Sequence, residues 1–212
     1  MRIALIHALA HSVDPINTVM QAQWPEATRM NLLDDSLSAD LASGGRGLDA
    51  AMHQRFLDLA DYAVGTGADG ILFTCSAFGP CIDAVKAKHP NMPVLKPNEA
   101  MIAEAQKLGG PVGLIASFAS TLKTMPDEFD ARTRLDTQLV EAALSALNQG
   151  QGERHDALVL DAAQQLIARG AEVIALAQFS MARAAPLLRQ ELTVPVLTTP
   201  DSAVAALKLA LA

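Results

Sequence analysis

One stretch of the sequence combines a thiol and two hydroxyls at a point where a buried strand is expected to end. Residues 67–78 begin with a Gly-Ala-Asp-Gly turn signal, continue with the apolar run 71–73, and then present Thr74, Cys75 and Ser76. Ligands of open α/β sheets bind at the carboxyl ends of strands, where free helix N–H groups suit an anion. Cys75 is therefore a candidate nucleophile or proton-transfer group, and in that role we expect it to alkylate fast near neutral pH. The alternative is a small buried residue, as free cysteines often are.

The composition limits the kinds of partner and compartment. The chain has 212 residues and a formal net charge of −7, which disfavours nucleic acid and anionic membranes as partners. Its two cysteines, Cys75 and Cys81, form neither a disulfide framework nor a metal-ligand pattern, so a reducing cytoplasm and no metal are expected. Residues 1–10 predict a first buried strand rather than a signal peptide, because His7 interrupts the apolar run. No segment is long and apolar enough to span a bilayer.

Strands and helices alternate in the first half of the chain. Strands are predicted at 2–8, 28–33, 71–73 and 93–95, and helices at 13–24, 48–64, 78–89 and 97–108. The loop 43–47 is rich in glycine, but it lacks the spacing and the Lys-Ser/Thr pair of a phosphate-binding loop. This alternation predicts a parallel α/β sheet.

The pattern then starts again after a Gly-Gly-Pro break at 109–111. Segments 112–116, 170–178 and 195–197 resemble 3–7, 67–75 and 93–95, in the same order and at a spacing of roughly a hundred residues each time. We therefore predict two parallel-sheet, Rossmann-like α/β lobes related by a pseudo-two-fold axis, with the active site in the cleft between them. The first lobe would comprise residues 1–97 and 200–212, and the second residues 98–199.

The second half contains three further predicted helices. Residues 120–149 are mostly helical by pattern, with 136–147 the clearest stretch. Residues 154–169 predict a helix that Gly170 closes. Thr199, followed by Pro and Asp, predicts the N-cap of the last helix.

The duplication pairs Cys75 with Gln178. A racemase needs two opposed acid–base groups at such positions, because one removes a proton from a stereocentre and the other returns a proton to the opposite face. Together with the stretches 74–76, 116–121 and 170–181, this layout resembles the aspartate/glutamate/hydantoin racemase superfamily, which also includes arylmalonate decarboxylase and maleate isomerase. The resemblance implies a cofactor-independent, racemase-like isomerase that acts on a small, amino-acid-like carboxylate, and a homo-oligomer.

The resemblance also assigns candidate site residues. Cys75 matches the first catalytic cysteine, Ser76 the hydroxyl that holds the substrate carboxylate, and Ser117 with Ser120 or Thr121 the threonines of the second lobe's first loop. The remaining candidates for substrate binding lie beside these positions or at the end of the second strand: Thr74, Ala77, Phe179, Ser180 and Asp35.

The chain departs from the family pattern at Gln178, which stands where the second cysteine belongs. An amide forms hydrogen bonds but cannot take or give a proton near pH 7. Cys81 lies in the same lobe as Cys75 and does not replace the missing thiol. One thiol could protonate a carbanion left by decarboxylation, attack a double bond as in maleate isomerisation, or work with His7 or Asp35 as a second base. A protein that binds small molecules without catalysis remains the alternative.

His7 and Asp35 also have simpler interpretations. A histidine at a strand end is more often a buried, hydrogen-bonded residue than a catalytic one. Asp34 and Asp35 are of a residue type that is common in turns. The sequence does not name the substrate. Few basic residues fall near strand ends, whereas four phenylalanines near the predicted site are compatible with an apolar or aromatic substrate: Phe73, Phe78, Phe118 and Phe179.

Overall fold

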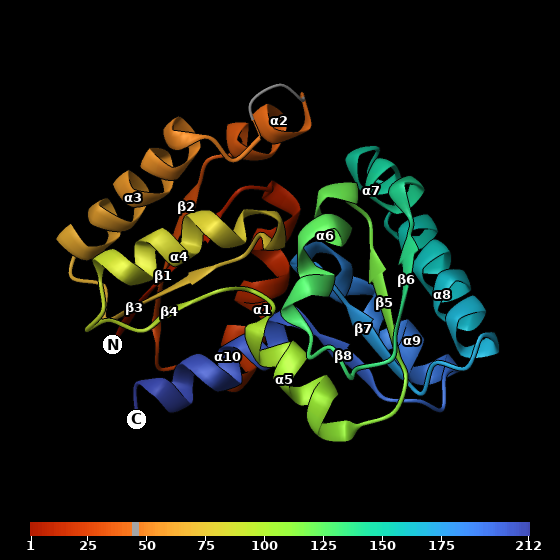
Figure 1. The fold of residues 1–212 in the computed structure, drawn as a ribbon. Helices are drawn as coiled ribbons and strands as arrows, with labels where there is room; N and C mark the ends of the chain where they lie inside the picture. The colour runs from red at the N-terminus through yellow and green to blue at the C-terminus, as the bar shows by residue number, and fades with distance from the viewer. Residues whose placement is uncertain (44–46) are drawn as a thin grey trace. The chain divides into compact units, whose positions relative to one another are not determined.

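The computed structural model describes residues 1–43 and 47–212 and divides into two units. The first unit comprises Met1–Pro97 and Ala203–Ala212, and the second comprises Asn98–Ser202. Each unit contains one four-stranded parallel sheet (Figure 1). Arg46 and most of the glycine-rich loop predicted at 43–47 lie outside the described residues.

The first unit has the strand order β2-β1-β3-β4. Its strands are β1 (Arg2–His7), β2 (Thr28–Leu33), β3 (Gly70–Phe73) and β4 (Val94–Leu95). Its helices are η1 (Ala10–Ser12), α1 (Val13–Gln23), α2 (Ser36–Ala42), α3 (Ala50–Gly65), η2 (Ser76–Phe78) and α4 (Gly79–Lys88), and the last turns of α10 (Thr199–Ala210) also belong to this unit.

The second unit repeats this order as β6-β5-β7-β8. Its strands are β5 (Val112–Ala116), β6 (Leu135–Leu139), β7 (Val173–Leu176) and β8 (Val196–Thr198). Its helices are α5 (Glu99–Leu108), α6 (Ala119–Thr124), η3 (Met125–Glu128), α7 (Glu141–Asn148), α8 (Gly152–Ala168), η4 (Phe179–Ala184) and α9 (Ala185–Glu191). The parallel α/β fold predicted for both halves is therefore confirmed.

The same backbone hydrogen bond occurs once in each sheet and shows which residues of the two sheets are equivalent. The N–H of Thr74 donates to the carbonyl of Ile6 at 3.0 Å, and the N–H of Ala177 donates to the carbonyl of Ile115 at 2.9 Å. Both bonds lie one residue beyond the central strand β3 or β7. Cys75 and Gln178, the next residues along, therefore occupy equivalent positions.

The helix predicted at 136–147 is wrong in its first part. Residues 135–139 form the strand β6, which pairs in parallel with β5, and a helix begins only at Glu141. The strand lies at a sheet edge and keeps Asp136, Thr137 and Gln138 at least partly exposed. Because such an edge strand carries few apolar residues, its pattern resembles a helix surface, and pairing with β5 decides the conformation.

Two smaller differences concern helix starts. The helix α2 at Ser36–Ala42 was not predicted, because a seven-residue helix carries little periodic signal. The last helix is capped by Thr198 and not by Thr199: the Thr198 hydroxyl accepts the N–H of Asp201 at 3.3 Å and donates to its carboxylate at 2.7 Å.

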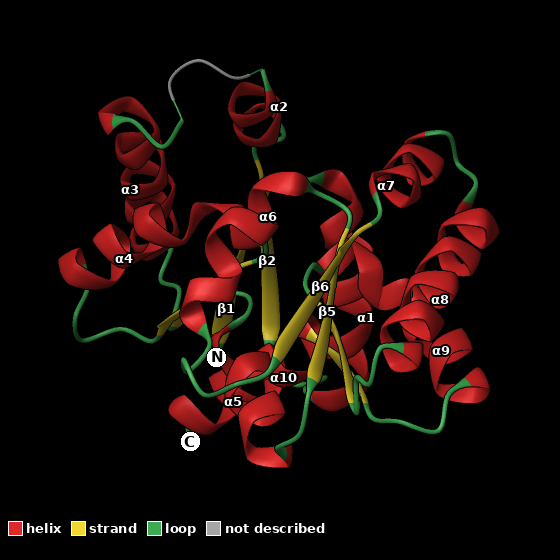
Figure 2. Cartoon of the chain, turned by 45° about the vertical axis from the view of Figure 1, so that its right-hand side comes forward, coloured by secondary structure: helices red, strands yellow, loops and turns green. Residues whose placement is uncertain are grey.

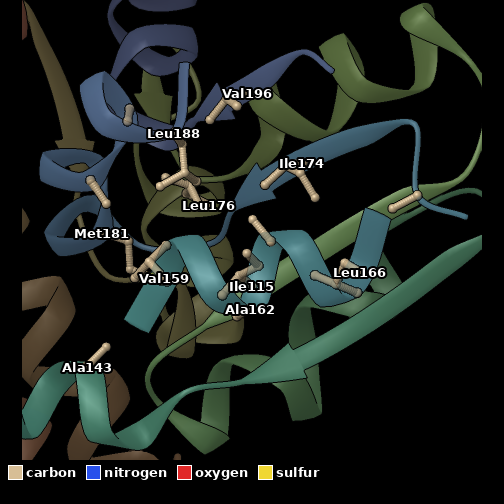
Figure 3. Packing of buried hydrophobic residues seen from close by; sticks show 14 residues of the cluster. Ile115, Ala143, Val159, Ala162, Leu166, Ile174, Leu176, Met181, Leu188 and Val196 are labelled. Carbon is tan, nitrogen blue, oxygen red and sulfur yellow. The ribbon is translucent and has the colours of Figure 1, made fainter. Parts of the chain in front are cut away.

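Alternating residues of β5 and β7 build two separate cores in the second unit. Ile115, Ile174 and Leu176 pack against α8 and α9 on one face (Figure 3). Leu114 and Ala175 pack with residues of α5 and η3 on the other face. Figure 2 shows the helices on both sides of the yellow strands β5 and β6. Coverage of both faces explains why β5 and β7 are almost entirely apolar.

The first unit has an aromatic core beneath the end of β3. The ring centroids of Phe56 and Phe73 are 5.4 Å apart, and those of Phe56 and Phe78 are 4.9 Å apart. All three rings are buried. Phe73 and Phe78 are therefore core residues that fix the chain on either side of Cys75, and they do not form an open aromatic wall for a substrate.

No helix among the described residues is both long and apolar enough to cross a bilayer.

Gly113 lies where β5 is packed most tightly, so Gly113→Ala should destabilise the protein. A Cβ there would meet Leu166 Cβ at 3.0 Å and Ala171 Cβ at 3.1 Å, and neither atom can rotate away. We expect the free energy of unfolding, measured by denaturant titration, to fall by about 1–3 kcal/mol. Gly65→Ala is the matched control, because Gly65 ends α3 with open space around the added methyl group. Equal stability of the two variants would contradict the packing described for β5.

Candidate active site

Cys75 lies immediately beyond β3, at the turn into η2. Its backbone is extended, with φ −125° and ψ 116°, and the chain turns into the short helix η2 at the next residue. The packing of Phe73 and Phe78 onto Phe56 fixes the backbone on both sides. The thiol is consequently held at the carboxyl edge of the first sheet, half-buried, where the sequence places it.

The backbone N–H of Ala77 and the hydroxyl of Ser38 both act to lower the pKa of the Cys75 thiol. Burial has the larger effect and raises the pKa of the Cys75 thiol to about 11. The thiol is therefore protonated at neutral pH in the unliganded protein. The sequence predicted a thiolate that alkylates fast, because Cys75 lies at a helix start. The structure differs because desolvation raises the pKa of the thiol more than Ala77 and Ser38 lower it.

His7 forms a buried hydrogen-bond network at the end of β1. Its Nδ1 lies 2.9 Å from the Thr74 hydroxyl and its Nε2 lies 3.0 Å from the Asn31 amide oxygen. Asn31 in turn exchanges two hydrogen bonds with Asn17, at 2.9 and 3.3 Å, and the Asn17 amide nitrogen also donates to the carbonyl of Val13 at 2.8 Å. Since that carbonyl can only accept, it fixes the orientation of both amides.

The network decides the tautomer of His7. The oxygen of Asn31 faces Nε2, so this nitrogen carries the proton, and burial lowers the pKa of His7 so that the ring is neutral. Nδ1 must then accept the hydroxyl proton of Thr74. Both ring nitrogens are occupied, as expected for a buried and hydrogen-bonded histidine. The Thr74 hydroxyl also lies 3.4 Å from the carbonyl of Ile6, but its shorter contact is with His7. Catalytic roles for these two residues stay predictions.

The other candidates in the first unit fall into two groups. Ser76 and Ala77 are buried beside Cys75 at the start of η2. Asp35 is exposed just before α2, and its side chain does not cap that helix. The structure therefore brings Ser76 and Ala77 to the thiol and leaves Asp35 on the surface.

Gln178 has the same backbone conformation as Cys75, with φ −136° and ψ 145°, and likewise precedes a short helix, η4. Its side-chain oxygen accepts the N–H of Ser117 at 2.6 Å and the Ser117 hydroxyl at 3.0 Å. These donors fix the orientation of the amide. Within the part of the chain that the structure describes, the Gln178 amide nitrogen has no hydrogen-bond partner, so it is available as a donor.

The remaining candidates of the second unit lie on two segments. Ser120 and the buried Thr121 belong to α6, and Phe179 and Ser180 are buried at the start of η4. The Ser180 hydroxyl has no hydrogen-bond partner among the described residues. Ser117 and Gln178 are in direct contact, and that contact follows from the adjacency of β5 and β7.

The sequence missed Ser38, Asn31 and Asn17. Ser38 approaches the thiol from a helix that was not predicted, and the two asparagines reach His7 through the edge strand β2 and the helix α1. No local motif identifies any of them. Among the described residues, no group of three or more His, Cys, Asp or Glu side chains could hold a metal ion.

The match to a known family covers almost the whole chain. The model of the Asp/Glu/hydantoin racemase family matches residues 8–207. The chain belongs to this family. No curated protein matches it.

Solved racemases share its fold at low sequence identity. Glutamate racemase isoform RacE1 from Bacillus anthracis is 12% identical, with a TM-score of 0.76, over 99% of this chain and 80% of that chain. Aspartate racemase from Picrophilus torridus is 12% identical, with a TM-score of 0.72 over 99% and 94%. Allantoin racemase from Klebsiella pneumoniae is 18% identical, with a TM-score of 0.70 over 99% and 86%. The racemase fold is thus shared by proteins named for different substrates.

Cys75 should be a slow thiol in the unliganded racemase-family protein. With the pKa raised to about 11, the thiolate is a minor species at pH 8, and we expect iodoacetamide to react roughly a hundredfold more slowly than with a free thiol. The logarithm of the rate should rise with pH without a plateau up to about pH 10. The measurement is the rate at the Cys75 peptide by mass spectrometry, with the urea-denatured protein as the control. A plateau near pH 8 would contradict the buried, protonated state.

His7 should make the folded protein less stable in mild acid. Burial lowers its pKa below the ordinary 6.5, so the unfolded chain binds more protons in the range just below 6.5. Stability should therefore fall as the pH drops below 6.5. We expect the unfolding free energy of wild type to fall more between about pH 8 and about pH 5.5 than that of His7→Asn, which lacks the titrating ring. His53→Asn on α3 is the control, and equal pH slopes for wild type and His7→Asn would refute the assignment.

Proposed function

We propose that this protein is a cofactor-independent enzyme of the racemase and isomerase type that transfers a proton at a carbon atom of a small carboxylate through Cys75. The observation that carries the proposal is the position of Cys75, immediately beyond β3 at the turn into η2, in a chain of the racemase family. A small amino-acid-like carboxylate is the substrate class. The names of two neighbours, which refer to glutamate and aspartate, support this class.

The thiol can act in both directions of a proton transfer. As an acid, the S–H group gives its proton to a carbanion or enolate carbon and becomes a thiolate. The Ala77 N–H and the Ser38 hydroxyl then stabilise that thiolate, because hydrogen bonds to a charged acceptor are stronger than those to a neutral one. In the reverse direction the thiolate removes the proton from the same carbon. The electron pair stays with the substrate, delocalised onto its carbonyl or carboxyl oxygen.

Gln178 supplies a different function at the equivalent position. Its oxygen is occupied by Ser117, so its amide nitrogen can donate to a substrate oxygen but cannot move a proton. Donors directed at an oxygen that gains charge stabilise the transition state. We therefore propose one proton-transfer residue and one hydrogen-bond donor, in place of two thiols.

A one-thiol decarboxylase of the same family is the second candidate. The protonated state of Cys75 favours it, because loss of carbon dioxide leaves a carbanion that needs only a proton donor. A cis–trans isomerase would need the thiolate as a nucleophile and receives less support from a thiol pKa of about 11. A cytoplasmic location, a homo-oligomer and the absence of a cofactor stay predictions.

Proton exchange in deuterated water tests the proposal. Aspartate, glutamate, a 5-substituted hydantoin and allantoin are incubated with the protein, and deuterium at the stereocentre is followed by NMR. We expect exchange with at least one compound, and its loss in Cys75→Ala by about 10²-fold or more. Cys81→Ala is the matched control, because Cys81 is a buried residue of α4. Exchange that persists in Cys75→Ala would refute the role of this thiol.

The stereochemical outcome distinguishes one base from two. Exchange without inversion indicates that Cys75 works alone. Inversion together with exchange requires a second proton-transfer group, and His7→Asn is then the variant to assay. Release of carbon dioxide from a malonate substrate, without exchange of the four compounds, would favour the decarboxylase.

Restoring a thiol at position 178 should change the reaction. Gln178→Cys places a second thiol at the position equivalent to Cys75, so we expect inversion to accelerate relative to exchange. Gln178→Ala removes a hydrogen-bond donor, so we expect it to slow exchange by about 10–100-fold. Chiral chromatography and NMR measure the two rates. Gln165→Ala is the control, since Gln165 only bonds Asp161 on the surface of α8. Unchanged exchange in Gln178→Ala would remove Gln178 from the site.

A further inference from the structure

An open pocket lies at the amino end of the second sheet. Its volume is about 400 Å³, and it is lined by the end of α5, by residues 109–111 before β5, and by Asp130 and residues 132–134 before β6. β5 and β6 pair in parallel, with Val112 opposite Leu135, so both segments enter the sheet at the same edge (Figure 1). All residues of the pocket belong to the second unit.

This pocket is separate from the candidate active site. Ser117 and Gln178 come after the carboxyl ends of β5 and β7. The pocket residues Pro111 and Arg134 come before the amino ends of β5 and β6. β5 has five residues and is therefore about 16 Å long. A small molecule in the pocket is thus at the opposite edge of the sheet from Gln178.

Arg134 brings an unpaired charge to the pocket. Its side chain is exposed and has no hydrogen bond or ion pair with any residue that the structure describes. Each of the other arginines in the described part of the chain donates from its side chain to a neighbouring oxygen. A guanidinium carries five N–H donors and no acceptor, so Arg134 offers its donors to solvent or to a bound molecule.

Arg132 adds a second guanidinium, whose charge is balanced by Asp130. Its backbone N–H, Nε and Nη2 donate to the Asp130 carboxylate at 2.9, 3.1 and 3.0 Å. These hydrogen bonds lower the pKa of Asp130 to about 2, so the pair is charged at neutral pH. Two arginines and one aspartate therefore leave the lining with an excess positive charge, in a chain whose net charge is −7.

The same pocket is also lined by neutral donors. The backbone N–H groups of Gly110 and Arg134 donate to no backbone carbonyl among the described residues. The hydroxyl of Thr133 and the amide of Gln106 belong to the lining as well. The carboxylate of Glu172 lies against Gly110, but Glu172 precedes β7, on the other side of β5 from β6, and does not line the pocket. Donors therefore outnumber acceptors, which suits an oxyanion.

We propose that this pocket is a second binding site, which takes the phosphate group of a small molecule through Arg134, with Arg132 and the loop N–H groups as further donors. A planar guanidinium binds two oxygens of a phosphate or a carboxylate in parallel. A phosphate is the better match, because it offers three oxygens to donors that come from separate segments, whereas a carboxylate offers two. The inference uses neither Cys75 nor Gln178, so it can fail while the proposed function holds, and the reverse.

An NMR titration with inorganic phosphate tests the site. Amide ¹H–¹⁵N shifts of the full chain are followed as inorganic phosphate replaces chloride at constant ionic strength. We expect saturable shifts that are largest at Gly110, Thr133 and Arg134. Shifts confined to residues 75–78 and 178–180 would place the anion at the candidate active site and overturn the inference, as would shifts that do not saturate.

Variants at the two arginines test which groups hold the anion. Arg134→Gln should weaken the affinity for phosphate about tenfold or more, because it removes charge-assisted hydrogen bonds. Arg132→Gln should also weaken binding, because it leaves the negative charge of Asp130 without its partner. Arg154→Gln is the matched control, since it removes the same charge from an exposed arginine of α8 that bonds Gln151 outside the pocket.

A thermal melt monitored by circular dichroism establishes that each variant is folded. An unchanged affinity in Arg134→Gln, or an equal loss in Arg154→Gln, overturns the inference.

Two further anions identify the chemistry of the ligand. Glycerol phosphate and inorganic phosphate share the phosphate group, and the tighter binder of the two identifies a phosphate ester or free phosphate as the source. Either result supports the site. Tighter binding of acetate than of both phosphates, at the same residues, overturns the assignment of a phosphate ligand.

Discussion

The proposed role of Cys75 depends on the free-energy cost of burying its sulfur atom at the end of β3. Desolvation raises the pKa of the Cys75 thiol, and only two donors oppose it. The surrounding elements follow from this constraint. The rings of Phe56, Phe73 and Phe78 fix the chain on both sides of Cys75. Rigid neighbours of this kind hold a side chain in one orientation, as a catalytic group requires.

The duplication preserves backbone geometry and changes side-chain chemistry. Thr74 and Ala177 make the same backbone bond, and the residues that follow them are both extended and both precede a short helix. In one unit this position holds a group that can move a proton. In the other it holds an amide whose oxygen is occupied by Ser117. The family fold therefore specifies where a functional side chain stands, and the side chain alone decides what it does.

Sequence patterns were sufficient where they were long or strongly apolar. The strands β1, β3, β5 and β7 are buried on both faces and read as continuous apolar runs, so the duplicated sheet and the equivalence of Cys75 with Gln178 could be derived from them. The edge strand β6 could not, because its polar residues gave no strand signal. Ser38 and Asn31 were not predictable either, since side-chain contacts across elements leave no local pattern. The thiol pKa depends on burial, which only a structure supplies.

The protonated state of Cys75 has a consequence for the lifetime of the protein. Peroxides and disulfides react with thiolates, and a thiol that remains protonated near neutral pH is oxidised slowly to sulfenic acid or mixed disulfide. A reactive cysteine usually needs reductants to stay functional. Here the same burial that raises the thiol pKa also protects the sulfur of the unliganded protein from oxidation.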